Sequence, residues 1–100
     1  MDIQKVSGNS LTQLTVNDNN RTLSICNSHA TDAVTIDLYI KDCAIGSTCA
    51  STTFYLLNNV VIPNGVTLRL DGGEFTYDKL TYNLFIILSA ADSVVDVIIR

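Results

Sequence analysis

The chain has 100 residues, of which 47% are hydrophobic and 16% are charged, and its formal net charge is −4 with a pI near 4.5. This length suits one hydrophobic core and predicts a single domain over residues 1–100. The six Lys and Arg residues are scattered singly, without the basic patch that phosphate binding needs, so we expect no nucleic-acid partner.

The N-terminus reads M-D-I-Q-K-V-S-G and lacks the apolar region of a secretory signal. No apolar run approaches the roughly 20 residues that a membrane helix needs. We therefore expect a soluble protein made in a cytoplasm, with no membrane partner. In that compartment Cys26, Cys43 and Cys49 are expected to stay reduced, and a Cys43–Cys49 disulfide across the short intervening loop is the alternative.

Alternation of apolar with other residues predicts strands in the first half of the chain. The clearest is Val34 to Lys41, in which every second residue is aliphatic. Asp2 to Val6, Leu11 to Val16 and Arg21 to Asn27 are predicted to be shorter strands, with turn residues between them. Because the connection S-H-A-T-D-A is short, we expect Arg21 to Asn27 to pair with Val34 to Lys41.

The sequence Ile62-Pro63-Asn64-Gly65 joins two apolar runs and favours a tight turn. We predict a β-hairpin whose arms are Phe54–Ile62 and Val66–Asp71, with Val60 facing Leu68. In this arrangement one face of the hairpin is buried and the other is exposed to water.

Asn58-Asn59 interrupts the first arm of that hairpin. Two amides within a strand predict a β-bulge, which shifts the side-chain phase by one residue. Downstream, Leu84–Leu88 is apolar at every position, which is typical of a strand covered on both faces. Val94–Ile99 alternates again and is predicted to be the last strand.

These segments predict an all-β fold, namely an antiparallel β-sandwich of seven to nine short strands with Ig-like or jelly-roll-like connections. A small closed barrel is the alternative. The core is expected to contain the aliphatic residues that share one phase, which are Leu23, Ile25, Ile36, Leu38, Ile62, Leu68, Ile86 and Val97.

No catalytic residue, cofactor site or metal site is expected. The single His, His29, lies in a turn without a second His or a suitably spaced carboxylate, and is expected to be a solvated loop residue. Asp71, Glu74 and Asp78 could offer oxygen ligands to Ca²⁺, but they lack the spacing of an EF-hand. Motifs of hydrolases, metalloproteases and phosphate-binding loops are absent, so we expect no enzyme activity.

Three segments carry a resemblance: R-T-L-S-I-C-N-S-H-A-T-D-A-V-T-I-D-L-Y-I, T-F-Y-L-L-N-N-V-V-I-P-N-G-V-T-L-R-L-D-G-G and S-V-V-D-V-I-I-R. Over Arg21 to Arg100 the chain resembles the small β-sandwich virion proteins of tailed bacteriophages, especially marine and cyanobacterial phages. The resemblance implies a virion protein made in the host cytoplasm, either a capsid decoration (cement) subunit or a neck or tail accessory subunit. Its partners would be the major capsid protein or neck and tail proteins.

A second hypothesis, from a different class, is a β-sandwich module that binds a glycan on a host surface. It would present the loops at residues 17–20 and 42–51. Sugar binding favours a flat Trp or Tyr platform, whereas this chain has no Trp and four Tyr residues, which argues for the structural role.

Apolar residues at outward positions predict a subunit contact, because an exposed apolar patch promotes association. The candidate interface residues are those out of phase with the core: Tyr55, Leu57, Val61, Phe85, Ile87, Val94 and Ile98. A homo-oligomer, for instance a trimer, or a lattice of partner proteins would bury them. In the alternative, the Asn58-Asn59 bulge rotates Tyr55 and Leu57 into the core, and no partner is needed for them.

Overall fold

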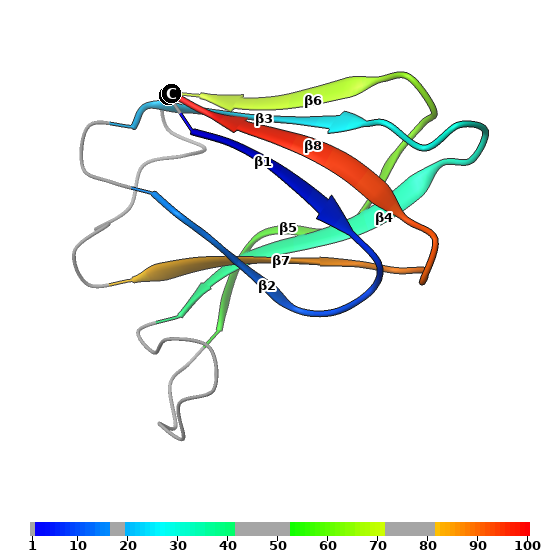
Figure 1. Cartoon of the computed structure of the whole chain (residues 1–100). Coiled ribbons are helices and arrows are strands. Elements are labelled where there is room, and N and C mark those ends of the chain that lie inside the picture. Colours follow the sequence, from blue (N-terminus) through cyan, green and yellow to red (C-terminus); the bar gives the residue numbers. More distant parts are fainter. Residues whose placement is uncertain (1, 17–19, 42–52, 72–81) are drawn as a thin grey trace.

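The computed structural model describes residues 2–16, 20–41, 53–71 and 82–100, and eight short strands make up their regular structure (Figure 1). They are β1 (Asp2–Ser7), β2 (Thr12–Leu14), β3 (Thr22–Asn27), β4 (Val34–Lys41), β5 (Phe54–Ile62), β6 (Thr67–Asp71), β7 (Asn83–Leu88) and β8 (Val94–Ile99). The described residues contain no helix, and so none that is long and apolar enough to span a membrane.

The strands form two antiparallel four-stranded sheets that lie face to face (Figure 1). Sheet A has the order β1-β8-β3-β6 and sheet B the order β2-β7-β4-β5. The pairs β1–β8, β2–β7, β3–β6 and β4–β5 are nested, so the chain resembles one long hairpin rolled over on itself. This nesting is the connectivity of a jelly roll. The predicted antiparallel β-sandwich is confirmed, with the jelly-roll type of connection.

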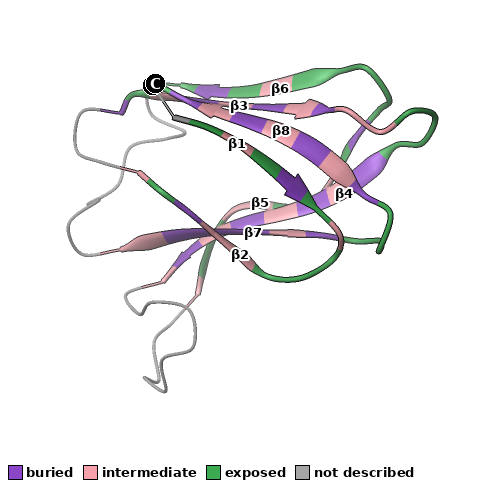
Figure 2. Ribbon diagram, viewed as in Figure 1, coloured by how far each residue is buried: buried purple, intermediate pink, exposed green. Residues whose placement is uncertain are grey.

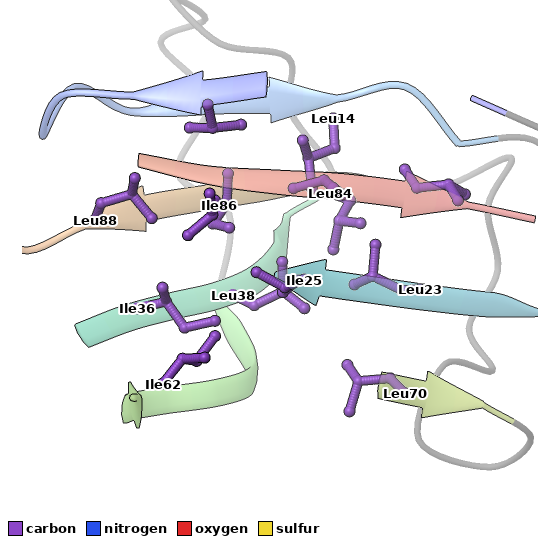
Figure 3. Close-up of a cluster of buried hydrophobic side chains, with 14 of the residues drawn as sticks. Leu14, Leu23, Ile25, Ile36, Leu38, Ile62, Leu70, Leu84, Ile86 and Leu88 are labelled. Atoms are coloured by element: carbon purple, nitrogen blue, oxygen red, sulfur yellow. The ribbon is translucent and has the colours of Figure 1, made fainter. Parts of the chain in front are cut away.

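The hydrophobic core lies between the sheets and contains inward residues from both of them (Figures 2 and 3). In β3 and β4, buried residues occupy every second position, as the alternation predicts. Figure 3 shows Ile25 of β3 beside Leu38 of β4, one from each sheet. All of the predicted core residues are buried except Leu68, which is half-buried and packs against the core. Each buried Leu, Ile or Val contributes about 1.5–3 kcal/mol to folding.

β5 and β6 do not form the predicted hairpin. Ile62 pairs with Val34 of β4, whereas Leu68 pairs with Ile25 of β3. The predicted turn is present, because Gly65 has a φ of 77° and the N–H of the next residue donates to Pro63 O at 3.1 Å. It carries the chain from sheet B to sheet A. A turn sequence specifies a reversal of direction, but does not specify which strand lies beside each arm.

β3 and β4 do not pair with each other either, so the expected pairing of Arg21 to Asn27 with Val34 to Lys41 is wrong. β3 lies between β8 and β6, and β4 lies between β7 and β5. The buried face of β4 is fully apolar and that of β3 is apolar up to Asn27 at its end, and as central strands of opposite sheets they bury these faces against each other. The short connection between them crosses from one sheet to the other.

The buried side chain of Asn27 joins these crossings at the end of β3. Its Nδ2 donates to the carbonyl oxygens of Asp32 at 2.9 Å and Ile62 at 2.8 Å, and its Oδ1 accepts the N–H of His29 at 2.9 Å. The backbone N–H of Asn27 donates to Val66 O at 3.0 Å. Every N–H donor of Asn27 therefore has a protein partner, as a residue that is only 1% exposed requires.

Replacing Asn27 with Ala should lower the free energy of unfolding by about 3 kcal/mol, because the carbonyls of Asp32 and Ile62 and the N–H of His29 lose their partner. Equilibrium urea unfolding followed by circular dichroism measures this change. Asn9→Ala, at an exposed position, is the control and should stay within about 0.5 kcal/mol of wild type. Equal effects of the two substitutions would contradict the role given to Asn27.

Candidate functional site

The outward face of sheet B brings side chains from three neighbouring strands into rows. β4 contributes Thr35, Asp37 and Tyr39, which alternate with its buried residues and so point away from the core. The register sets their neighbours on β7 and β5, where Tyr39 pairs with Phe85 and with Tyr55. The three rows, each read from β7 through β4 to β5, are Ser89, Thr35 and Val61, then Ile87, Asp37 and Asn59, and then Phe85, Tyr39 and Tyr55.

Aromatic rings occupy the third of these rows. The ring centroid of Tyr39 lies 5.5 Å from that of Tyr55 and 5.6 Å from that of Phe85. Such contacts attract by about 0.5–1.5 kcal/mol beyond the burial of area. Phe85 is 2% exposed, whereas Tyr55, on the edge strand, is 54% exposed. The row is therefore a platform held firmly at Phe85 and open at Tyr55.

The pKa of the Tyr39 phenol lies above its ordinary value of 10.0. Partial burial is the main cause, since it disfavours the charged phenolate, and the neighbouring Tyr55 and Asp37 add repulsion. The phenol therefore remains a neutral hydrogen-bonding group over a wider pH range than a free tyrosine.

The β-bulge predicted at Asn58-Asn59 is present. Between the positions opposite Ile36 and Leu38, β5 supplies one extra residue. Asn59 has a φ of 54°, in the left-handed region that Asn tolerates better than most residues. Its backbone N–H donates to Asp37 Oδ1 at 2.7 Å. The carboxylate thus satisfies a donor that the bulge removes from the strand ladder.

A second register shift in β5, opposite Leu38 and Tyr39, separates Leu57 from Tyr55. Leu57 pairs with Leu38, is half-buried and packs against the core, so its expected outward position is wrong. Tyr55 keeps the outward position. The alternative in which the bulge turns both residues inward therefore holds for Leu57 alone.

The other candidate interface residues divide between two opposite faces of the sandwich. Val61, Phe85 and Ile87 lie on the outward face of sheet B, although Phe85 is covered. Val94 and Ile98 are half-buried and lie on the outward face of sheet A, because they alternate with the buried residues of β8. No single patch therefore contains them all.

A pocket of about 260 Å³ opens on the outward face of sheet B, next to the aromatic row. Its lining is polar and apolar in about equal parts and consists of Asn9, Thr35, Asp37, Asn59, Ile87, Leu88 and Ser89. Asp37 Oδ1 is held by Asn59, and Asp37 Oδ2 has no hydrogen-bond partner among the described residues. The pocket therefore presents one carboxylate oxygen, amides and hydroxyls within a small space.

His29, Asp32 and Asp92 form a separate cluster, in which one ligand atom from each lies within 4.8 Å of the others. Nδ1 of His29 accepts the backbone N–H groups of Thr31 at 3.1 Å and Asp32 at 3.0 Å. The proton of the neutral imidazole therefore sits on Nε2, which lies 3.3 Å from Asp92 Oδ2. A protonated Nε2 has no lone pair for a metal, so the cluster is better suited to fastening loops than to binding a cation.

His29 lies in a loop, as expected, but its side chain is half-buried and not solvated. Its side chain is 16% exposed and contacts Asp92 from the loop between β7 and β8. The two residues are 63 positions apart in the sequence, so no local pattern could indicate their contact.

Several candidate residues lie outside the described part of the chain. They include Cys43 and Cys49 of the alternative disulfide, Glu74 and Asp78 of the considered Ca²⁺ site, residues 17–19 and the loop at 42–51. Cys26, which is described, is a free and half-exposed cysteine.

Comparison with known protein families, with curated proteins and with solved structures finds no match to this chain.

Replacing Asn59 with Val should destabilise the protein by about 1–2 kcal/mol, because a β-branched residue is strained at a left-handed φ. Asn59→Gly should stay within about 0.5 kcal/mol of wild type, since Gly adopts this φ freely and keeps the N–H that Asp37 accepts. Urea unfolding of both variants, with Asn58→Val as the matched neighbour, measures the difference. Similar stabilities for the Val and Gly variants would contradict the left-handed bulge.

Stability should also depend on Tyr39 at high pH. Above about pH 10 the unfolded chain releases this phenolic proton before the native chain does, so stability falls as the pH rises through the higher, native pKa of Tyr39. Tyr39→Phe removes this contribution, and its free energy of unfolding should fall less between about pH 9 and about pH 11 than that of wild type. The same pH dependence in both proteins would be evidence against the raised pKa.

Proposed function

We propose that this chain is a non-enzymatic structural subunit of a phage virion, either a capsid decoration subunit or a neck or tail accessory subunit. It attaches to other virion proteins, or to copies of itself, through the outward face of sheet A. We infer the attachment surface from Ile3, an exposed apolar residue on the edge strand β1.

The fold is compatible with this role. Jelly rolls form the capsid domains of many viruses, and they also form lectins, so this support is an analogy at the level of the fold. The resemblance of residues 21–100 to small virion proteins points to the same class. The single His of the chain contacts two backbone N–H groups through Nδ1 and Asp92 through Nε2, so its ring is engaged in holding loops together.

Ile3 combines high exposure with a position on an edge strand, which suits a surface that contacts a partner. Ile3 is 68% exposed, the highest value among the large hydrophobic residues of the described ranges, and it pairs with Ile98 of β8. Beside them, Lys5 Nζ forms an ion pair with Asp96 Oδ1 at 2.7 Å. A partner that covers this surface would bury an apolar side chain, which contributes about 1.5–3 kcal/mol for a residue of this size. β1 is an edge strand of sheet A, and no described strand pairs with its outer edge, which therefore offers backbone groups to a partner.

The virion role is tested on particles of the phage that encodes the chain. Antibodies against the purified chain should label these particles, on the head if it is a decoration subunit and at the neck or tail if it is an accessory subunit. Immunogold electron microscopy locates the label. Purified particles that lack the chain by immunoblotting would overturn the proposal.

Ile3→Asp tests the attachment surface, because a carboxylate at this position would be desolvated by an apolar partner. We expect incorporation of the variant into particles, in competition with wild type, to fall by about tenfold, which corresponds to roughly 1.4 kcal/mol. Val61→Asp, at an exposed position on the opposite sheet, is the matched control and should be incorporated normally. Normal incorporation of Ile3→Asp would show that attachment uses another surface.

A further inference from the structure

We propose that the outward face of sheet B binds a neutral glycan. One pyranose ring stacks on Tyr55 and Tyr39, and its hydroxyls form hydrogen bonds with polar side chains of the adjoining pocket. This site differs from the loops that the sequence suggested for glycan binding. The proposal does not depend on the virion role or on the sheet A surface.

Tyr55 and Tyr39 form a stacking platform for a sugar ring. Tyr55 is 54% exposed, and its neighbour Tyr39 is held between it and the buried Phe85. The face of an aromatic ring is negative, so it attracts the polarised C–H groups on one face of a sugar ring while that face is removed from water. The absence of Trp therefore does not exclude sugar binding, because the fold gathers two of the four Tyr residues and a Phe into one row.

The pocket that contains Asp37 lies close enough to this platform for one sugar ring to reach both. Asp37 and Tyr39 are two residues apart on β4, a rise of roughly 7 Å, so a ring seated over Tyr39 and Tyr55 brings its edge close to Asp37. Asp37 Oδ2 can accept a sugar hydroxyl, and such charge-assisted bonds are roughly twice as strong as neutral ones. Asn59 and Thr35 line the same pocket and add neutral donors and acceptors.

The size and charge of the pocket select among ligands. Its volume of about 260 Å³ lies just below the usual range of small-molecule pockets, roughly 300–1,000 Å³, so it suits part of one ring and not a buried oligosaccharide. Asp37 is the charged residue of the lining, and the chain as a whole carries a charge of −4. Both features disfavour sulfated, sialylated or phosphorylated sugars.

The site is also fixed before any ligand arrives. The bond from the Asn59 N–H to Asp37 Oδ1 at 2.7 Å holds the carboxylate, and the ring contacts on both sides hold Tyr39. Fixed groups lose little conformational entropy on binding. A protein partner is less suitable here, because a flat apolar surface would bury the free oxygen of Asp37 without a hydrogen bond.

Affinity electrophoresis tests the proposal. The folded chain is run in native gels that contain a soluble glucan, galactan, mannan or xylan, in gels with dextran sulfate, and in gels without polysaccharide. We expect at least one neutral polysaccharide to retard the chain and dextran sulfate not to do so. Tyr55→Ala should abolish the retardation. Asp37→Asn keeps an oxygen acceptor for the Asn59 N–H, and this variant should lower the association constant for the polysaccharide by about tenfold.

Phe54→Ala is the matched control. Phe54 is 50% exposed on the same strand, but it pairs with the inward-facing Ile40 and its ring contacts Tyr82, so it lies outside the platform. This variant should be retarded like wild type. Incorporation of Tyr55→Ala into virions should also be normal, which separates this site from the proposed attachment surface.

Three results would overturn the proposal. The first is no retardation by any of the neutral polysaccharides, or retardation by dextran sulfate alone. The second is equal loss of retardation in the Tyr55→Ala and Phe54→Ala variants, which would mean that the platform is not the site. The third is a change in sedimentation coefficient for Tyr55→Ala without any retardation of wild type, which would identify this face as a protein contact.

Discussion

The hydrogen bonds of the Asn27 side chain link two of the places where the chain crosses from one sheet to the other. One amide reaches the last residue of β5, the connection between β3 and β4 and the backbone of His29. The crossing from β3 to β4 and the crossing from β5 to β6 are therefore held together by one residue. The first crossing joins central strands of the two sheets and the second joins edge strands, so this contact helps to set the relative position of the two sheets.

The irregular course of β5 gives sheet B its distinctive outward face. Without extra residues, Tyr55 and Leu57 would point to the same side. The two register shifts direct Leu57 into the core and leave Tyr55 beside Tyr39. Asp37 participates in the same arrangement, because it stabilises the first bulge through one oxygen and leaves the other without a hydrogen-bond partner among the described residues. Folding and surface chemistry thus share the same side chain.

The sequence predicted the strands and most of the core, because alternation and turn residues are local signals. Val34–Lys41 was predicted with the bounds that the structure has, and the Asn58-Asn59 bulge was found from two amides alone. Strand pairing was mistaken for both β3–β4 and β5–β6, since short connections suggested hairpins and the nested order is a non-local property. The aromatic row and the contact of His29 with Asp92 likewise depend on residues from distant strands. The second shift in β5 has no signal in the sequence, because Leu56 is an ordinary strand residue.

The central position of β8 in sheet A has a consequence for folding. β8 lies between β1 and β3, so these two strands from the first third of the chain do not pair with each other. Each of them pairs with β8, which follows them in the chain by more than 60 residues. Sheet B needs nothing beyond β7 and is complete earlier in synthesis. Folds dominated by such distant pairings mature in milliseconds to seconds, and until then they expose strand edges that can aggregate. Until β8 lies between β1 and β3, sheet A is incomplete and cannot fully cover the inward apolar face of sheet B.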